Sequence, residues 1–101
     1  MNQIRGVEDR PGGTVRTAQT SDMIGDSAWA RLKEGLGLSP RELQLVQGVF
    51  EDQTEGAIAD DLGLSPHTVH TYFERLHRKL GVRNRVQLIL RVTQEYLAMT
   101  R

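Results

Sequence analysis

The sequence predicts a small all-α protein built around a helix-turn-helix unit. Apolar residues recur at spacings of three and four, and no segment shows the sustained alternation typical of half-buried strands. Helix-capping signals divide the chain into short helices. Two of these helices are separated only by Gly63-Leu64-Ser65, a glycine-containing connector of the helix-turn-helix kind.

The composition excludes several classes of protein. At 101 residues the chain has room for one domain with a modest core, and the absence of cysteine excludes disulfide scaffolds and thiolate metal sites. No apolar run is long enough for a membrane span or a signal sequence, so we expect a cytoplasmic protein without a membrane partner. The chain lacks a nucleophile elbow and a phosphate-binding loop, and we therefore expect no enzymatic activity and no cofactor.

The N-terminal part is predicted to contain a tail and one helix. Residues 1–20 show no hydrophobic period and are expected to form a disordered, flexible tail. Residues 21–37 are predicted to hold an additional N-terminal helix, about 22–35, that begins at a Ser21-Asp22 cap. The single tryptophan, Trp29, lies on its apolar face and is expected in the core.

Residues 38–101 are predicted to form a domain of four helices. The first opens on Ser39-Pro40-Arg41-Glu42, where Ser39 and Glu42 can form a capping box and Pro40 needs no hydrogen-bond partner. Ser65-Pro66 repeats the serine cap at the start of the third helix. The four helices are expected at residues 40–51, 55–62, 66–80 and 84–98.

The net charge is zero, but the charges are sorted along the chain. Residues 39–62 hold one arginine and six acidic residues, a net charge of −5, whereas residues 65–85 hold five basic residues and one acidic residue, a net charge of +4. Because salt limits the reach of an exposed charge to roughly 10 Å, the local field decides phosphate binding. The basic segment is compatible with DNA, although a solvated helix face would have the same charge.

The predicted helix 66–80 carries two different faces on a helical wheel. Val69, Phe73, Leu76 and Leu80 form a narrow stripe that is expected to face the core. The opposite face carries side chains that can address base edges in the major groove, and cations that can hold phosphates lie beside the stripe and toward the C-terminal end. The predicted base contacts are His67, His70, Thr71 and Glu74, and the predicted phosphate contacts from the basic residues are Arg75, Arg78, Lys79, Arg83 and Arg85.

Three ordered motifs carry a resemblance to a known family. Leu38–Glu42 fits the pattern L-T/S-x-R-E, residues 58–65 fit I-A-x-x-L-x-h-S with h apolar, and residues 68–85 fit T-V-x(6)-I/L-x-x-K-L-G-V-x-x-R. Over about residues 38–97 the chain thus resembles the LuxR-type (GerE-like) helix-turn-helix DNA-binding domains. The resemblance implies a four-helix domain whose third helix enters the major groove and whose fourth often mediates dimerisation.

The resemblance also implies roles for single residues. The family's base-contacting positions fall on His70, Thr71 and Glu74, and its positions near the phosphate backbone fall on Thr68, Lys79 and Arg85. The family usually has lysine where His70 stands, histidine where Tyr72 stands and often a basic or polar residue where Glu74 stands. A carboxylate at position 74 repels phosphate but can accept a hydrogen bond from cytosine N4. Together these departures predict weaker nonspecific binding than a lysine-bearing relative would show.

The last predicted helix has a wider apolar sector than one core contact needs. We expect it to form a homodimer, the simplest use of a second apolar surface. The alternative is that the N-terminal helix of the same chain covers this patch. One edge consists of Val86, Leu90, Thr93 and Leu97, and the residues assigned to the dimer interface are Leu88, Val92, Tyr96 and Met99.

These observations predict a sequence-specific DNA-binding transcriptional regulator that lacks its own sensory domain and is controlled by a separate regulatory protein, by dimerisation or by its own abundance. A protein–protein interaction module is the alternative of another class, and a steep salt dependence of binding would separate the two. A relative of sigma-factor region 4 is the alternative within the DNA-binding class, although Lys79–Val82 favours the LuxR type. His67, His70 and Glu74 share one face, but no fourth ligand accompanies them, so no metal site is expected.

Overall fold

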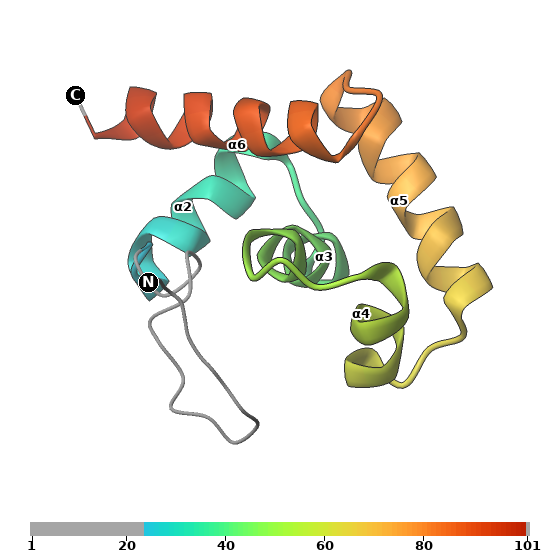
Figure 1. Cartoon of the computed structure of the whole chain (residues 1–101). Helices are drawn as coiled ribbons and strands as arrows, with labels where there is room; N and C mark the ends of the chain where they lie inside the picture. The colour runs from blue at the N-terminus through green and yellow to red at the C-terminus, as the bar shows by residue number, and fades with distance from the viewer. Residues whose placement is uncertain (1–23, 101) are drawn as a thin grey trace, which may run out of the picture.

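The computed structural model describes residues 24–100, and all regular structure in this range is helical (Figure 1). The all-α prediction is therefore confirmed. The predicted tail, residues 1–20, and the predicted Ser21-Asp22 cap lie outside the described residues. The helices are α2 (Asp26–Leu36), α3 (Pro40–Phe50), α4 (Glu55–Leu62), α5 (Pro66–Leu80) and α6 (Arg85–Met99).

The helix boundaries of the four-helix part follow the local signals closely. Ser39 and Glu42 form the predicted capping box: the Glu42 amide donates to Ser39 Oγ at 3.1 Å, and the Ser39 amide donates to Glu42 Oε1 at 2.8 Å. Thr54, Ser65 and Asn84 likewise accept from backbone amides three residues further on. Side-chain caps thus begin all four of these helices.

The start of the N-terminal helix was predicted wrongly. The helix begins at Asp26, and Gly25 before it is extended, with φ −64° and ψ 166°, and has no side-chain cap. Ile24 and Trp29 occupy the N′ and N4 positions of this start, and both are buried. Burial of this hydrophobic pair, rather than a polar cap, accounts for where the helix begins.

Three of the four connections use the same C-terminal corner. Gly37, Gly63 and Gly81 each follow a helix with φ near +70°, a conformation that glycine adopts without steric cost. Their amides, and those of the next residues, donate back into the last helical turn in the Schellman arrangement. The α3–α4 connection differs, because the non-glycine residue Asp52 takes the positive φ there, at 58°.

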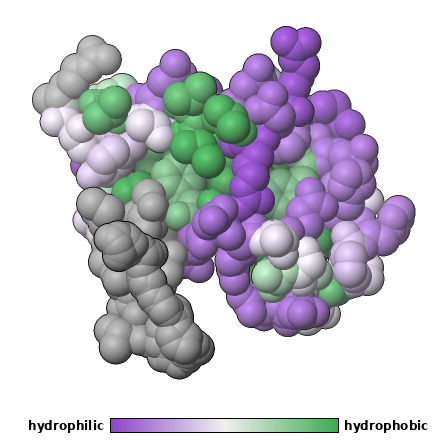
Figure 2. All heavy atoms as spheres, viewed as in Figure 1, coloured by the Kyte–Doolittle hydropathy of each residue, from purple (hydrophilic) through white to green (hydrophobic). Residues whose placement is uncertain are grey.

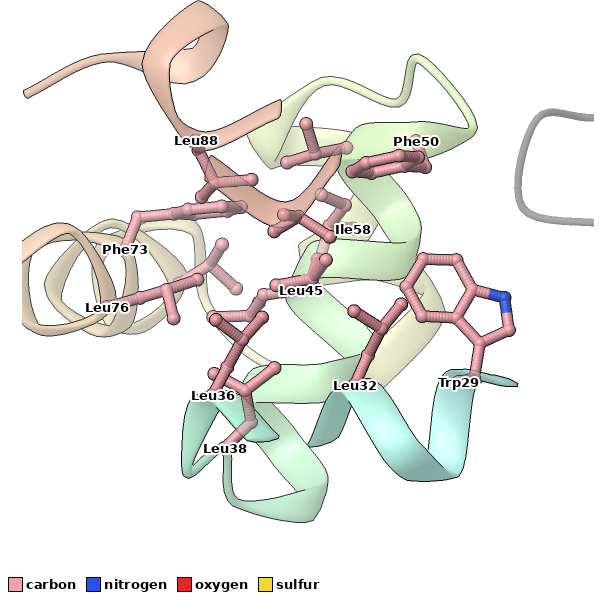
Figure 3. Packing of buried hydrophobic residues seen from close by; sticks show 14 of the residues in the cluster. Trp29, Leu32, Leu36, Leu38, Leu45, Phe50, Ile58, Phe73, Leu76 and Leu88 are labelled. Atoms are coloured by element: carbon pink, nitrogen blue, oxygen red, sulfur yellow. The ribbon is translucent and has the colours of Figure 1, made fainter. Parts of the chain in front are cut away.

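Side chains from every described helix meet in one core, which Figure 3 shows from close by. Leu45 of α3 is fully buried at its centre, and α2 contributes Leu32 and Trp29. The Trp29 ring meets Phe50 edge to face, with centroids 5.6 Å apart. The prediction that Trp29 lies in the core is confirmed.

The packing of Ile58 of α4 against α3 depends on a glycine. A Cβ atom at Gly48 would lie 2.8 Å from two side-chain carbons of Ile58, which is itself buried. Such a separation is far below van der Waals contact, so any larger residue at position 48 would force Ile58 to shift. The missing side chain at Gly48 thus leaves room for Ile58 of α4 in the core beside α3.

The predicted role of α6 needs a correction. Leu88 and Val92 are fully buried inside the protomer, so their assignment to a dimer interface is wrong. Tyr96 and Met99, assigned to the same interface, are half-buried and pack against the core. The reason is that α2, α3 and α5 all pack against this side of α6. Helix α2 lies along it (Figure 1), which is the alternative that the sequence analysis left open, and Leu88 lies beside Phe73 of α5 (Figure 3). The large apolar side chains that α6 leaves exposed lie on its other edge: Val86 at 65%, Leu90 at 56% and Leu97 at 57%.

Candidate nucleic-acid interface

The two helices of the helix-turn-helix, α4 and α5, are joined by Gly63, Leu64 and Ser65. Three side chains of α5, Val69, Phe73 and Leu76, are buried, as the helical wheel predicted. Leu80, the fourth residue of the stripe, is half-buried and packs against the core. The polar face of α5, opposite the buried stripe, is therefore turned away from the protein, and this side of the molecule is hydrophilic (Figure 2).

The outward face of α5, which we call the reading face, contains the four residues predicted to contact bases. His67, His70 and Glu74 are exposed, and Thr71 is half-buried beside them. Because these positions lie three and four residues apart on one helix, their side chains can enter one groove together. The structure brings the predicted set to one face; contact with bases stays a prediction.

A small charged cluster occupies the centre of the reading face. His70 Nδ1 lies 3.3 Å from Glu55 Oε1 of α4, and His70 Nε2 lies 3.7 Å from Glu74 Oε2. Glu55 was not among the predicted site residues, because its distance from His70 in the sequence conceals the contact. A negative group therefore flanks His70 on each side.

The N-terminal turn of α5 is suited to an anion. Ser65 Oγ accepts from the Thr68 amide at 3.1 Å and donates to Thr68 Oγ1 at 2.9 Å. No acidic side chain lies in this turn. Free amides and the helix dipole make such an end favourable for phosphate.

The predicted phosphate contacts divide into two groups. Arg75, Arg78 and Arg83 are exposed, and within residues 24–100 their guanidinium groups form no hydrogen bond or ion pair. Lys79 and Arg85 instead have partners inside the protein. Lys79 Nζ donates to the carbonyl of Gly37 at 2.9 Å and to Glu42 at 2.7 Å, and Arg85 Nη2 donates to the carbonyl of Gln53 at 2.6 Å.

Lys79 joins the far end of α5 to the corner between α2 and α3. Its partner Glu42 also accepts from the Ser39 amide. Partial burial acts to raise the pKa of the Glu42 carboxyl, but the bonds and the charge of Lys79 together with the bonds to Ser39 outweigh it, so the pKa is lowered. The carboxylate is thus held ionised as part of the scaffold that orients α5.

A pocket beside the reading face adds a cation that the sequence reasoning missed. It lies between the start of α3 and the middle of α5 and is lined by Ser39, Arg41, Glu42, Tyr72 and Arg75. Arg41 and Arg75 come from different helices and both line this pocket, and Arg41 Nη1 also donates to Gln44 Oε1 at 3.1 Å. The signal that could have pointed to Arg41 is that it is the only basic residue in an otherwise acidic segment.

Comparison with known proteins identifies the family to which the helix-turn-helix belongs. The family described as "Bacterial regulatory proteins, luxR family" matches residues 36–92. The chain is 31% identical over 90 residues to the probable HTH-type transcriptional regulator GfsR of Streptomyces halstedii, covering 84% of this chain and 37% of that protein. It is 42% identical over 55 residues to the transcriptional regulatory protein UhpA of Escherichia coli (strain K12), covering 54% of this chain and 28% of that protein.

The chain belongs to the luxR family of bacterial regulatory proteins, and its helix-turn-helix is a DNA-binding domain of the transcription-regulator type. It spans about a third of the length of the curated relatives that it matches. No solved structure is significantly similar to it. Among the described helices, none is long and apolar enough to cross a membrane.

Proposed function

We propose that this protein binds duplex DNA sequence-specifically, with α5 in the major groove, and that it regulates transcription without catalysing a reaction. One observation carries the proposal: α5 buries Val69, Phe73 and Leu76 and turns His67, His70, Thr71 and Glu74 outward. An α-helix fits the major groove, where histidine, threonine and carboxylate side chains can all bond to base edges. As the DNA of a bacterium lies in the cytoplasm, we place the protein there.

Phosphate contacts would flank this reading face. Arg75, Arg78 and Arg83 are exposed cations along and just beyond α5, and Arg41 lies across the pocket from Arg75. Thr68 lies in the acid-free first turn of α5, where a phosphate can meet backbone amides. Lys79 and Arg85 are secondary candidates, because their donors already bind inside the protein.

Selection from random duplex DNA tests the proposal. The expected result is an enriched sequence whose binding weakens steeply as salt rises, because several phosphate contacts release counterions. Thr71→Ala should relax the preference at one base position by about 1–3 kcal/mol, whereas Arg78→Ala should weaken binding to all sequences and flatten the salt slope. Enrichment of no sequence, together with binding to a protein and a flat salt response, would favour the interaction-module alternative.

We further propose a homodimer through the exposed edge of α6. Val86, Leu90 and Leu97 lie at spacings that place them along one side of the helix, and together they form an apolar strip that this protomer leaves open. Figure 2 shows hydrophobic residues at the surface along α6. A second copy of the strip, related by a two-fold axis, would bury it and would set two reading helices about one turn of DNA apart.

Sedimentation analysis of the wild type and of Leu90→Glu tests the dimer. The wild type should associate and the variant should remain monomeric, because a carboxylate would be buried without a partner. Sites enriched by the wild type should contain two half-sites about 10 base pairs apart from centre to centre. A monomeric wild type bound to single half-sites would exclude this arrangement.

A further inference from the structure

Glu55 links the two helices of the helix-turn-helix on the side that faces DNA in the proposed function. It lies in the first turn of α4, and its carboxylate reaches His70 of α5 at 3.3 Å. Glu55, His70 and Glu74 all have substantially exposed side chains, at 44%, 59% and 59%. The contact therefore lies on the surface and does not belong to the core.

The chemistry of the contact assigns the two ring nitrogens. An ionised carboxylate can only accept a hydrogen bond, so Nδ1 must donate its proton to Glu55. The nitrogen that gains or loses the second proton is then Nε2, which lies 3.7 Å from Glu74. Among the described residues, the charged groups that face His70 are Glu55 from α4 and Glu74 from its own helix.

The charge of this cluster depends on the second proton. With Nε2 unprotonated, the imidazole is neutral, the two carboxylates give the cluster two net negative charges, and the Nε2 lone pair lies near Glu74. With Nε2 protonated, the imidazolium pairs with both carboxylates and leaves one net negative charge. A duplex brings dense negative charge to the same surface and thus favours the protonated cluster.

We propose that Glu55 is a positioning residue for DNA recognition, and that the Glu55–His70–Glu74 cluster couples DNA binding to the uptake of one proton on His70 Nε2. This inference rests on the proposed function of α5. Nε2 lies 3.7 Å from Glu74, which is beyond hydrogen-bond distance, so its proton stays available to an acceptor in the major groove such as guanine O6 or N7. The cluster therefore reads an acceptor on a base edge only after the proton is bound.

The test measures affinity against pH by fluorescence anisotropy, with the duplex that random selection enriches most as the probe. Because one proton is taken up, the affinity should rise as pH falls from about 8 to about 6, by about three- to tenfold. His70→Gln should abolish the rise. Glu55→Gln should bind more tightly than the wild type at the higher pH, since it removes a charge that repels phosphate, and should show a smaller rise.

Two control variants separate this cluster from other histidines. His77→Gln changes a half-buried ring that packs near Phe73, away from the cluster, and should keep the full pH dependence. His67→Gln removes a proposed base contact and should lower the affinity at every pH while keeping the rise, and loss of the rise in His67→Gln instead of His70→Gln would overturn the proposal. Thermal unfolding of each variant confirms that it folds.

The pH dependence of Glu55→Gln distinguishes a positioning role of Glu55 from a purely structural one. If it only supported the fold, Glu55→Gln would lower stability and affinity together and leave the pH dependence unchanged, which would contradict the proposal. Wild-type binding with a steep salt dependence but no pH dependence would refute the proton coupling and leave the proposed function intact. A wild type that ignores DNA at every pH would refute both.

Discussion

The corners before α3 and before α5 are built from the same four residue types but have different roles. Gly37-Leu38-Ser39-Pro40 and Gly63-Leu64-Ser65-Pro66 share the glycine corner, the serine cap and proline at the first helical position. The difference lies at the third helical position, where the first has Glu42 and the second has Thr68. The Glu42 carboxylate accepts from the Ser39 amide at the start of α3 and binds Lys79, whereas the first turn of α5 contains no acidic residue. One local motif thus supports the scaffold in one place and, in the proposed function, accepts a phosphate in the other.

The largest expected effect comes from the leucines of the two corners. Leu38 is 5% exposed, whereas Leu64 is half-buried. Leu38→Ala should lower the free energy of unfolding by about 2–4 kcal/mol, because it leaves a cavity in the core. Leu64→Ala should cost about half as much. Urea unfolding of the two variants provides the comparison, and equal losses would show that the two corners are equally buried in solution.

The bond between Glu42 and Lys79 should make stability depend on pH. Because the folded-state pKa of Glu42 is lowered, its contribution is complete well above the unfolded pKa, which is about 4.3, and is lost as pH falls through the folded value. Glu42→Gln should lower the free energy of unfolding by about 1–2 kcal/mol near neutral pH.

Urea titrations at several pH values test this expectation. The difference between the wild type and Glu42→Gln should shrink as the solution is acidified below about pH 4. A difference that stays constant with pH would show that the carboxylate charge contributes nothing. Glu34→Gln, which changes an exposed carboxylate, serves as the matched control.

Thr68→Glu would convert the α5 corner into a copy of the α3 corner. The new capping box should raise the free energy of unfolding by about 0.5 kcal/mol. The same carboxylate should weaken DNA binding by about 1–2 kcal/mol, since it occupies the end that a phosphate would approach. Thr68→Gln, which can form the box without a charge, is the control and should bind DNA more tightly than Thr68→Glu.

The smallest expected effect concerns the one connection without a glycine. Asp52 takes φ 58° between α3 and α4. Asp52→Gly should relieve this strain, while the greater freedom of glycine in the unfolded chain offsets part of the gain. The net rise in the free energy of unfolding should be a few tenths of a kcal/mol, measurable by thermal unfolding. A loss of stability would mean that the 3.9 Å approach of Asp52 to Arg85 matters more than the backbone.

Local signals predicted the elements that depend on neighbours in sequence. The caps at Ser39, Thr54, Ser65 and Asn84 satisfy amides only three residues away, so their helices could be placed within one residue. The start of α2 could not be placed in this way, because a pair of buried side chains sets it. The inward stripe of α5 was predictable because its polar and apolar sides differ sharply.

Contacts between distant residues decided the parts that were missed. The two apolar edges of α6 look alike in sequence, and only its packing against α2, α3 and α5 buries Leu88 and Val92 while Leu90 stays exposed. The sequence predicted that Lys79 contacts phosphate, but in the structure its ammonium group binds Glu42, 37 residues away. Arg41 and Glu55 gain significance only beside Arg75 and His70.

The sequence by itself determined helices α3 to α6, the glycine corners, the family and the face of α5 that turns outward, because caps, glycines and a helical period act over a few residues. The tertiary structure alone decided which edge of α6 is open, which cations are free for phosphate and which carboxylates surround His70. Those outcomes depend on packing between helices that lie far apart in the chain, and no local pattern records how such helices meet.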